Sequence, residues 1–78
     1  MAHHQLDARR LLCPMPVIRT QNFVAGLPAG DTVEVFCTDP GALNDVPAWC
    51  RINGHTVVDT RREGDDVVIT VRVGETAD

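Results

Sequence analysis

The chain has 78 residues, of which 44% are hydrophobic, and its formal net charge is −4. This length supports one small hydrophobic core, so we expect a single domain over residues 1–78 with its core at about residues 6–73. No apolar run is long enough to cross a membrane. An acidic chain with so few aromatic residues also lacks the cationic contacts that binding to nucleic acid requires.

The first half of the chain predicts a strand, a helix and a second strand. The first strand is short, at residues 5–9, and the helix begins with Pro14 at its first position and runs to about residue 27. A turn at residues 28–31 leads into the strand at residues 32–38. The apolar stripe of the helix is expected to be Val17, Ile18, Val24 and Leu27, and the buried face of the strand Val33, Val35 and Cys37.

The second half predicts another helix and two further strands. Asp39 and Pro40 are typical of a helix cap and first helical position, and the apolar pattern continues to Ile52, although Pro47 should kink or divide this helix. Gly54 is expected to end it in the left-handed conformation. Strands at residues 55–62 and 67–73 follow, joined by a turn at 63–66, and residues 74–78 are expected to fray.

The resulting order, β-α-β-α-β-β, indicates one α/β domain. Two helices can cover one face of a four-stranded sheet as a two-layer sandwich. The sequence shows no internal repeat and no linker. Its pattern leaves the order of the strands and the parallel pairing open.

Cys13 stands directly ahead of the first helix, in the segment Cys13-Pro14-Met15-Pro16. The start of a helix has unpaired N–H groups and a positive pole, which stabilise a thiolate and lower the pKa of a cysteine. The chain contains no lysine, serine or tyrosine, so cysteine is its strongest nucleophile. The alternative is a buried cysteine ahead of an ordinary proline helix start.

The charge around Cys13 differs from that of the rest of the chain. Residues 1–30 carry Arg9, Arg10 and Arg19 against a single aspartate, Asp7, whereas residues 31–78 are strongly acidic. These arginines are candidates for stabilising the thiolate or for binding an acidic partner, or they simply keep the domain soluble. Asp7 is a candidate base or loop anchor.

The remaining cysteines and histidines are weaker candidates. Cys37 is expected in the core, and Cys50 in the core or as a second thiol that resolves or accepts. His55 is either structural or a proton donor. The spacings typical of zinc sites are missing, so no metal is predicted. An odd number of cysteines and no signal peptide indicate a cytoplasmic protein without a disulfide framework.

The order of these short motifs resembles the TusA/SirA family of sulfur carriers. The residues that carry the resemblance extend from about residue 6 to residue 73; they are Leu6, Asp7, Leu11, Cys13-Pro14-Met15-Pro16-Val17, Asp39-Pro40, Asp45, Pro47 and Gly54-His55. The resemblance implies a two-layer α/β sandwich in which both helices pack against a four-stranded mixed sheet.

The resemblance also implies a cytoplasmic sulfurtransferase without a cofactor, in which Cys13 carries sulfane sulfur as a persulfide and Pro14 and Pro16 support the start of the helix. Its donor would be a cysteine desulfurase, a rhodanese or a similar protein, and its acceptor a relay protein. The sulfur would serve thiolation of transfer RNA, molybdenum-cofactor maturation or sulfur oxidation. We expect a monomer.

One departure from the family, and two alternative functions, come with this interpretation. Family members commonly have glycine three positions before the motif cysteine, where this chain has Arg10. If that position needs a positive φ, Arg10 strains or reshapes the loop. The alternatives are a non-catalytic protein-binding regulatory module, and a thiol redox sensor that pairs Cys13 with Cys50.

Overall fold

A computed structural model describes residues 2–12 and 14–74, and its elements follow the predicted order. The ends of the helices and strands differ from the predicted ends by no more than three residues. In chain order the elements are β1 (His3–Ala8), α1 (Met15–Val24), β2 (Thr32–Cys37), α2 (Ala42–Asn53), β3 (Thr56–Glu63) and β4 (Asp66–Arg72).

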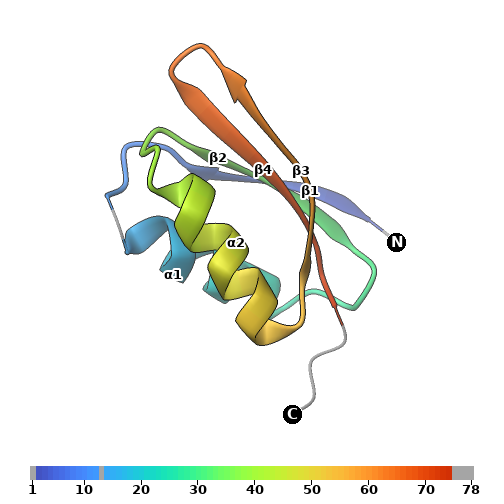
Figure 1. Cartoon of the computed structure of the whole chain (residues 1–78). Coiled ribbons are helices and arrows are strands. Elements are labelled where there is room, and N and C mark those ends of the chain that lie inside the picture. The colour runs from blue at the N-terminus through green and yellow to red at the C-terminus, as the bar shows by residue number, and fades with distance from the viewer. Residues whose placement is uncertain (1, 13, 75–78) are drawn as a thin grey trace.

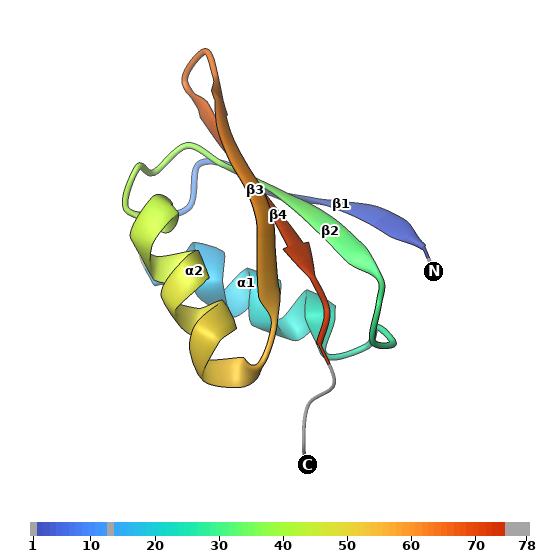
Figure 2. The ribbon, with the colours of Figure 1, turned by 45° about the vertical axis from the view of Figure 1, so that its right-hand side comes forward.

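The four strands form one mixed sheet in the order β1-β2-β4-β3. β1 and β2 are parallel, with His3 opposite Thr32 and Ala8 opposite Cys37, whereas β4 runs antiparallel to both of its neighbours. A parallel pair needs a crossover connection, which α1 supplies. Both helices pack on the same face of the sheet (Figures 1 and 2). The implied two-layer α/β sandwich is therefore confirmed.

The core lies between the helices and the two central strands. Successive residues of a strand point to opposite faces of the sheet, and the face of β2 that carries Val33, Val35 and Cys37 is fully buried, as predicted. The same face of β4 contributes Val67, Ile69 and Val71. Because the central strands β2 and β4 are neighbours in the sheet but distant in the sequence, the core combines residues that lie far apart in the chain.

The face of the sheet away from the helices carries a polar network around Glu34. Its carboxylate accepts hydrogen bonds from Gln5 Nε2 at 3.2 Å and from Arg61 Nη2 at 3.1 Å, and it lies 3.2 Å from His3 Nε2. Arg61 Nε also donates to Glu63 at 2.6 Å. The bonds from Gln5, His3 and Arg61 lower the pKa of Glu34. The charged side chains of this network therefore pair with one another on the face of the sheet that the helices do not cover.

The stripe predicted for α1 is partly wrong. The helix buries Pro16, Thr20 and Val24, one residue from each turn, while Ile18 is 40% exposed. Thr20 can be buried because its hydroxyl donates to the carbonyl oxygen of Pro16 at 2.8 Å, which satisfies its polar group locally. A buried polar residue at the centre of the stripe concealed the true face of the helix.

The second helix begins later than predicted and is not divided. It starts at Ala42 with Gly41 as its cap, and Asp39 Oδ1 accepts a hydrogen bond from the Gly41 amide at 3.0 Å, so Asp39 stabilises the preceding turn. Pro47 lies inside the continuous helix. Gly54 ends α2 with φ 80°, as predicted. Neither helix in the described residues has the length and hydropathy of a membrane span.

The prediction that the chain frays from residue 74 onward is wrong at its first residue. The backbone N–H of Gly74 donates to His55 Nδ1 at 3.0 Å, which fixes the end of the described chain against the end of α2. Residues 75–78, the rest of the predicted tail, lie outside the described residues.

Candidate functional site

The candidate site is the start of α1 and the loop that precedes it. Cys13 itself lies outside the described residues, but both of its neighbours, Leu12 and Pro14, are described. The amide of Met15 donates to the carbonyl oxygen of Leu12 at 2.8 Å, and the amide of Ile18 to that of Pro14 at 3.2 Å. These two bonds tie Leu12 and Pro14 to the first turn of α1.

The start of α1 has features that favour a bound or attached anion. Pro14 is the cap residue, one position before the first helical position predicted for it, and Pro16 lies in the first turn. In the described residues no side chain caps this helix, and its first turn contains no acidic residue. The positive pole of the helix is thus not offset by an aspartate or glutamate of the helix itself.

Three exposed apolar side chains surround this helix start. Leu12 is 76% exposed, Met15 42% and Ile18 40%; we call these three residues the apolar rim. Met15 and Ile18 are three positions apart on α1, so they lie on one face of the helix. Clustered exposed apolar side chains are typical of a surface that another protein covers.

Arg9 is held by acidic side chains. Its guanidinium bonds to Asp7 at 2.9 and 3.2 Å and lies 3.6 Å from Asp66. The Arg9 hydrogen bonds lower the pKa of Asp7 to about 2, so Asp7 is a poor base at neutral pH. Asp7 also accepts the backbone N–H of Arg9 at 3.0 Å, which favours the loop-anchor interpretation. Arg9 therefore has less positive charge to offer a thiolate.

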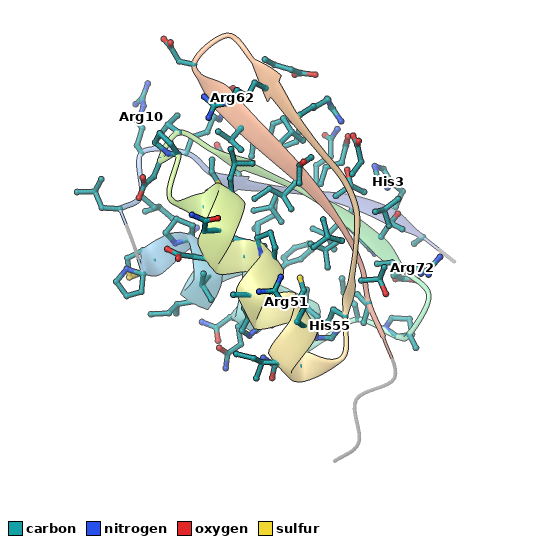
Figure 3. All side chains as sticks on the ribbon, viewed as in Figure 1. His3, Arg10, Arg51, His55, Arg62 and Arg72 are labelled. Carbon is teal, nitrogen blue, oxygen red and sulfur yellow. The ribbon has the colours of Figure 1, made fainter. Side chains whose placement is uncertain are left out.

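Arg10 is held in a strained backbone conformation. Its φ is 66°, which makes it the one non-glycine residue with positive φ in the described residues. Its backbone N–H donates to Thr38 Oγ1 at 2.9 Å, which ties the loop before Cys13 to the end of β2. The side chain is exposed and points away from the body of the domain (Figure 3). Arg19 is likewise exposed, on α1. Arg10 and Arg19 thus present their charges to solvent.

The other two cysteines are part of the core. Cys37 is fully buried and Cys50 is 1% exposed. Burial raises the pKa of each thiol to about 11, with Asp39 adding to the rise at Cys37. Protonated, inaccessible thiols are poor nucleophiles. Burial of Cys50 weighs against its use as a resolving or accepting thiol, and with it against the redox-sensor alternative.

His55 lies at the far end of α2 from the start of α1, and it packs with its ring centroid 4.9 Å from that of Trp49 (Figure 3). Burial lowers the pKa of its imidazole. Together with its bond to Gly74, this placement makes His55 structural with respect to the loop at Cys13. Within residues 2–12 and 14–74, no three histidine, cysteine, aspartate or glutamate side chains are grouped to hold a metal ion.

The model of the family Sulfurtransferase TusA matches residues 4–73. The chain belongs to the TusA sulfurtransferase family. The match includes the loop, both helices and all four strands, so it extends over the candidate site and over the sheet that positions it.

Individual relatives agree with the family. YrkI of Bacillus subtilis, named as a sulfur carrier protein, is 41% identical over 69 residues, covering 88% of this chain and 92% of YrkI. NMA0882 of Neisseria meningitidis, also named as a sulfur carrier, is 37% identical over 73 residues, covering 94% of this chain and 96% of its own. Membership of a sulfur-carrier family implies interaction with sulfur donor and acceptor proteins.

A solved structure supports the fold. The crystal structure of a SirA-like protein from Desulfitobacterium hafniense matches with a TM-score of 0.80 and 24% identity, covering 92% of this chain and 99% of that one. The agreement extends over nearly the whole of both chains. The arrangement of two helices on a four-stranded mixed sheet is thus the fold of that neighbour.

The strain at Arg10 predicts that glycine at this position stabilises this family member. Arg10→Gly removes the Cβ that opposes a positive φ, and we expect the free energy of unfolding to rise by about 0.5–1 kcal/mol. Arg10→Ala is the matched control, because it removes the guanidinium but keeps the Cβ, and should leave stability nearly unchanged. Urea unfolding of the three proteins measures both effects, and equal stability of Arg10→Gly and Arg10→Ala would contradict the prediction.

Proposed function

We propose that this protein is a persulfide carrier whose sulfur is held on Cys13. The Cys13 thiolate attacks the outer sulfur of a cysteine persulfide on a donor protein; a new S–S bond forms at Cys13, and the donor cysteine leaves as a thiolate. An acceptor thiolate then attacks the outer sulfur on Cys13, and the Cys13 thiolate leaves. Each step exchanges one S–S bond for another, so no external oxidant or reductant is consumed.

The observation that carries the proposal is the uncapped start of α1 directly after Cys13, in a chain of the sulfurtransferase family. The described residues provide no side-chain cap and no acid in the first turn, with Pro14 and Pro16 supporting the helix start. A thiolate attached there gains the stabilisation that a helix gives to an anion, and a thiolate is both the attacking and the leaving group in the exchange. Cys37 and Cys50 are too deeply buried to compete.

The apolar rim and the exposed arginines describe the surface that a partner must fit. A partner that fits this surface needs an apolar patch opposite Leu12, Met15 and Ile18. It also needs acidic residues around that patch, opposite Arg10 and Arg19. The donor is a cysteine desulfurase, a rhodanese or a similar persulfide-forming protein, and the acceptor a relay protein. Both must use the same surface in turn, because the sulfur leaves from the atom that received it.

The destination of the sulfur depends on the acceptor. Thiolation of transfer RNA, molybdenum-cofactor maturation and sulfur oxidation, the three routes that the resemblance implies, share this exchange at Cys13. The cytoplasm suits the reaction, since its thiol pool keeps an unloaded Cys13 reduced.

The test is mass spectrometry of the intact protein and its peptides after incubation with a cysteine desulfurase and cysteine. We expect one added sulfur atom on the Cys13 peptide, removed by reductant, and complete loss of this adduct in Cys13→Ser with no loss of folding. Cys50→Ala is the matched control and should keep the adduct, because the buried thiol takes no part.

Two results would overturn the proposal. One is sulfur loading of Cys13→Ser equal to that of the wild type. The other is no loading of the wild type by either an active desulfurase or inorganic polysulfide. In the second case, a donor protein that still binds the apolar rim of Cys13→Ser would support the non-catalytic regulatory module.

A further inference from the structure

Away from the Cys13 loop, a groove lies at the C-terminal ends of both helices. It has a volume of about 610 Å³, within the range of small-molecule sites. We call it the helix-end groove; it is lined by residues from α1 and the turn after it (Gln21, Val24, Ala25, Leu27, Ala29), from α2 and its end (Trp49, Asn53, His55), and from the chain after β4 (Val73, Gly74). Among the described residues that line it there is no aspartate, glutamate, lysine or arginine.

His55 offers one hydrogen-bond donor to this groove. Nδ1 accepts the backbone N–H of Gly74 at 3.0 Å, so Nδ1 carries no proton and the neutral ring has its proton on Nε2. His55 is only 9% exposed, yet in the described residues no buried side-chain nitrogen or oxygen lacks a partner. Among the described residues Nε2 has no hydrogen-bond partner, which indicates that this atom is accessible, and His55 is one of the residues that line the groove.

The rest of the lining indicates what the donor would meet. Trp49 lies against His55, with the ring planes tilted by 32°, and supplies a flat apolar wall. Val24 and Leu27 add apolar side chains to the lining. Both helices end at the groove, and helix C-termini carry negative partial charge, which disfavours an anion. The described lining residues offer a charged ligand no counter-ion.

We propose that the helix-end groove binds a neutral, planar aromatic or heteroaromatic molecule that presents a hydrogen-bond acceptor to Nε2 of His55. The molecule stacks along Trp49 and fills the space between the ends of α1 and α2. The Gly54-His55 pair thus has a role in binding, in addition to ending the helix. This site lies at the opposite ends of the helices from Pro14 and does not depend on the sulfur chemistry (Figures 1 and 3).

Quinoline and indole are suitable probes. Both are bicyclic and uncharged at pH 8, but only quinoline has a ring nitrogen that accepts a hydrogen bond. The chain has one tryptophan, so the Trp49 indole N–H gives a single NMR signal. In the full-length protein we expect quinoline to shift this signal and the signal of the Gly74 amide. Both shifts should level off as the quinoline concentration rises. Indole should bind about fivefold more weakly, the ratio that one hydrogen bond accounts for.

Variants and nitrogen NMR distinguish a hydrogen bond from His55 Nε2 from non-specific apolar binding. His55→Asn keeps an oxygen that can accept from the Gly74 amide, but its shorter side chain places no donor at the position of Nε2, so the preference for quinoline should fall to about one. Ile52→Ala, at an 82% exposed position on α2 outside the groove, is the matched control and should change nothing. If His55→Asn does not fold, the wild-type His55 ring nitrogens decide: a protonated Nε2 that shifts with quinoline supports the proposal.

Several outcomes would overturn it. These are shifts that never saturate, an unchanged quinoline preference in folded His55→Asn, a proton on Nδ1 in place of Nε2, or equal binding of the 1-methylquinolinium cation. The last result would mean that the helix ends attract positive charge and that the Nε2 donor is irrelevant.

Discussion

Replacing Ile69 with alanine is expected to lower the free energy of unfolding by about 3 kcal/mol. Ile69 is fully buried at the middle of β4, a central strand of the sheet, opposite Val35 on β2 and Thr60 on β3. Alanine removes three carbon atoms from a fully buried site on the face of the sheet that the helices cover (Figure 1). The cavity is costly because paired strands on both sides keep the backbone from closing over it.

The size of this loss is large for so short a chain. A domain of 78 residues has a total stability of roughly 4–12 kcal/mol. The same change should lower the melting temperature by roughly 12–24 °C. Urea and thermal unfolding followed by circular dichroism measure both quantities.

Ile52→Ala is the matched control for Ile69→Ala. It makes the same chemical change at a side chain that is 82% exposed, and we expect a change within about 0.5 kcal/mol. A loss of stability at position 52 equal to that at position 69 would mean that the buried face has been assigned wrongly.

Residue patterns predicted the strands of the core well, because strand burial alternates in a simple way. Val33, Val35 and Cys37 occupy every second position of β2, and the structure buries all three. The helices were harder. Ile52 ends the apolar pattern of the second helix but is exposed to solvent. Thr20 is buried because its hydroxyl bonds within its own helix, which a hydrophobic pattern does not show.

The candidate site was likewise predictable from sequence only in part. The residues around Cys13 were found from sequence because proline and cysteine at a helix start have local physical meaning. The pairing of Arg9 with Asp66 and the bond from Arg10 to Thr38 depend on where the sheet brings distant segments, so no local pattern contains them. Comparison with the family's glycine indicated that Arg10 would be strained if position 10 had a positive φ, and the structure gives φ 66° there.

The helix-end groove was missed for the same reason as the docking of Gly74. Its lining comes from α1, α2 and the chain after β4, which meet only in the folded domain. The Gly-His pair at positions 54 and 55 was the one available signal. Composition around Gly74 resembles that of a frayed tail, and only the structure shows that its amide bonds to His55.

Replacing Gly74 with alanine is therefore expected to destabilise the domain by about 2 kcal/mol, although the residue lies near the end of the chain. A Cβ at position 74 would lie 1.8 Å from the carbonyl oxygen of Gly54, and this oxygen belongs to the backbone at the left-handed end of α2. The backbone must shift, and the bond from the Gly74 amide to His55 is lost with it.

Gly26→Ala provides the comparison, because a Cβ at position 26 would meet nothing within 4 Å and the backbone there needs no positive φ. We expect Gly26→Ala to be neutral or slightly stabilising, since alanine restricts the unfolded chain. In Gly74→Ala, the amide at position 74 should also exchange with deuterium faster than in the wild type, because its acceptor is lost. If Gly74→Ala is as stable as Gly26→Ala and keeps its amide protected, Gly74 is not held between Gly54 and His55. Loss of stability without faster exchange would place the strain elsewhere in the turn after α2.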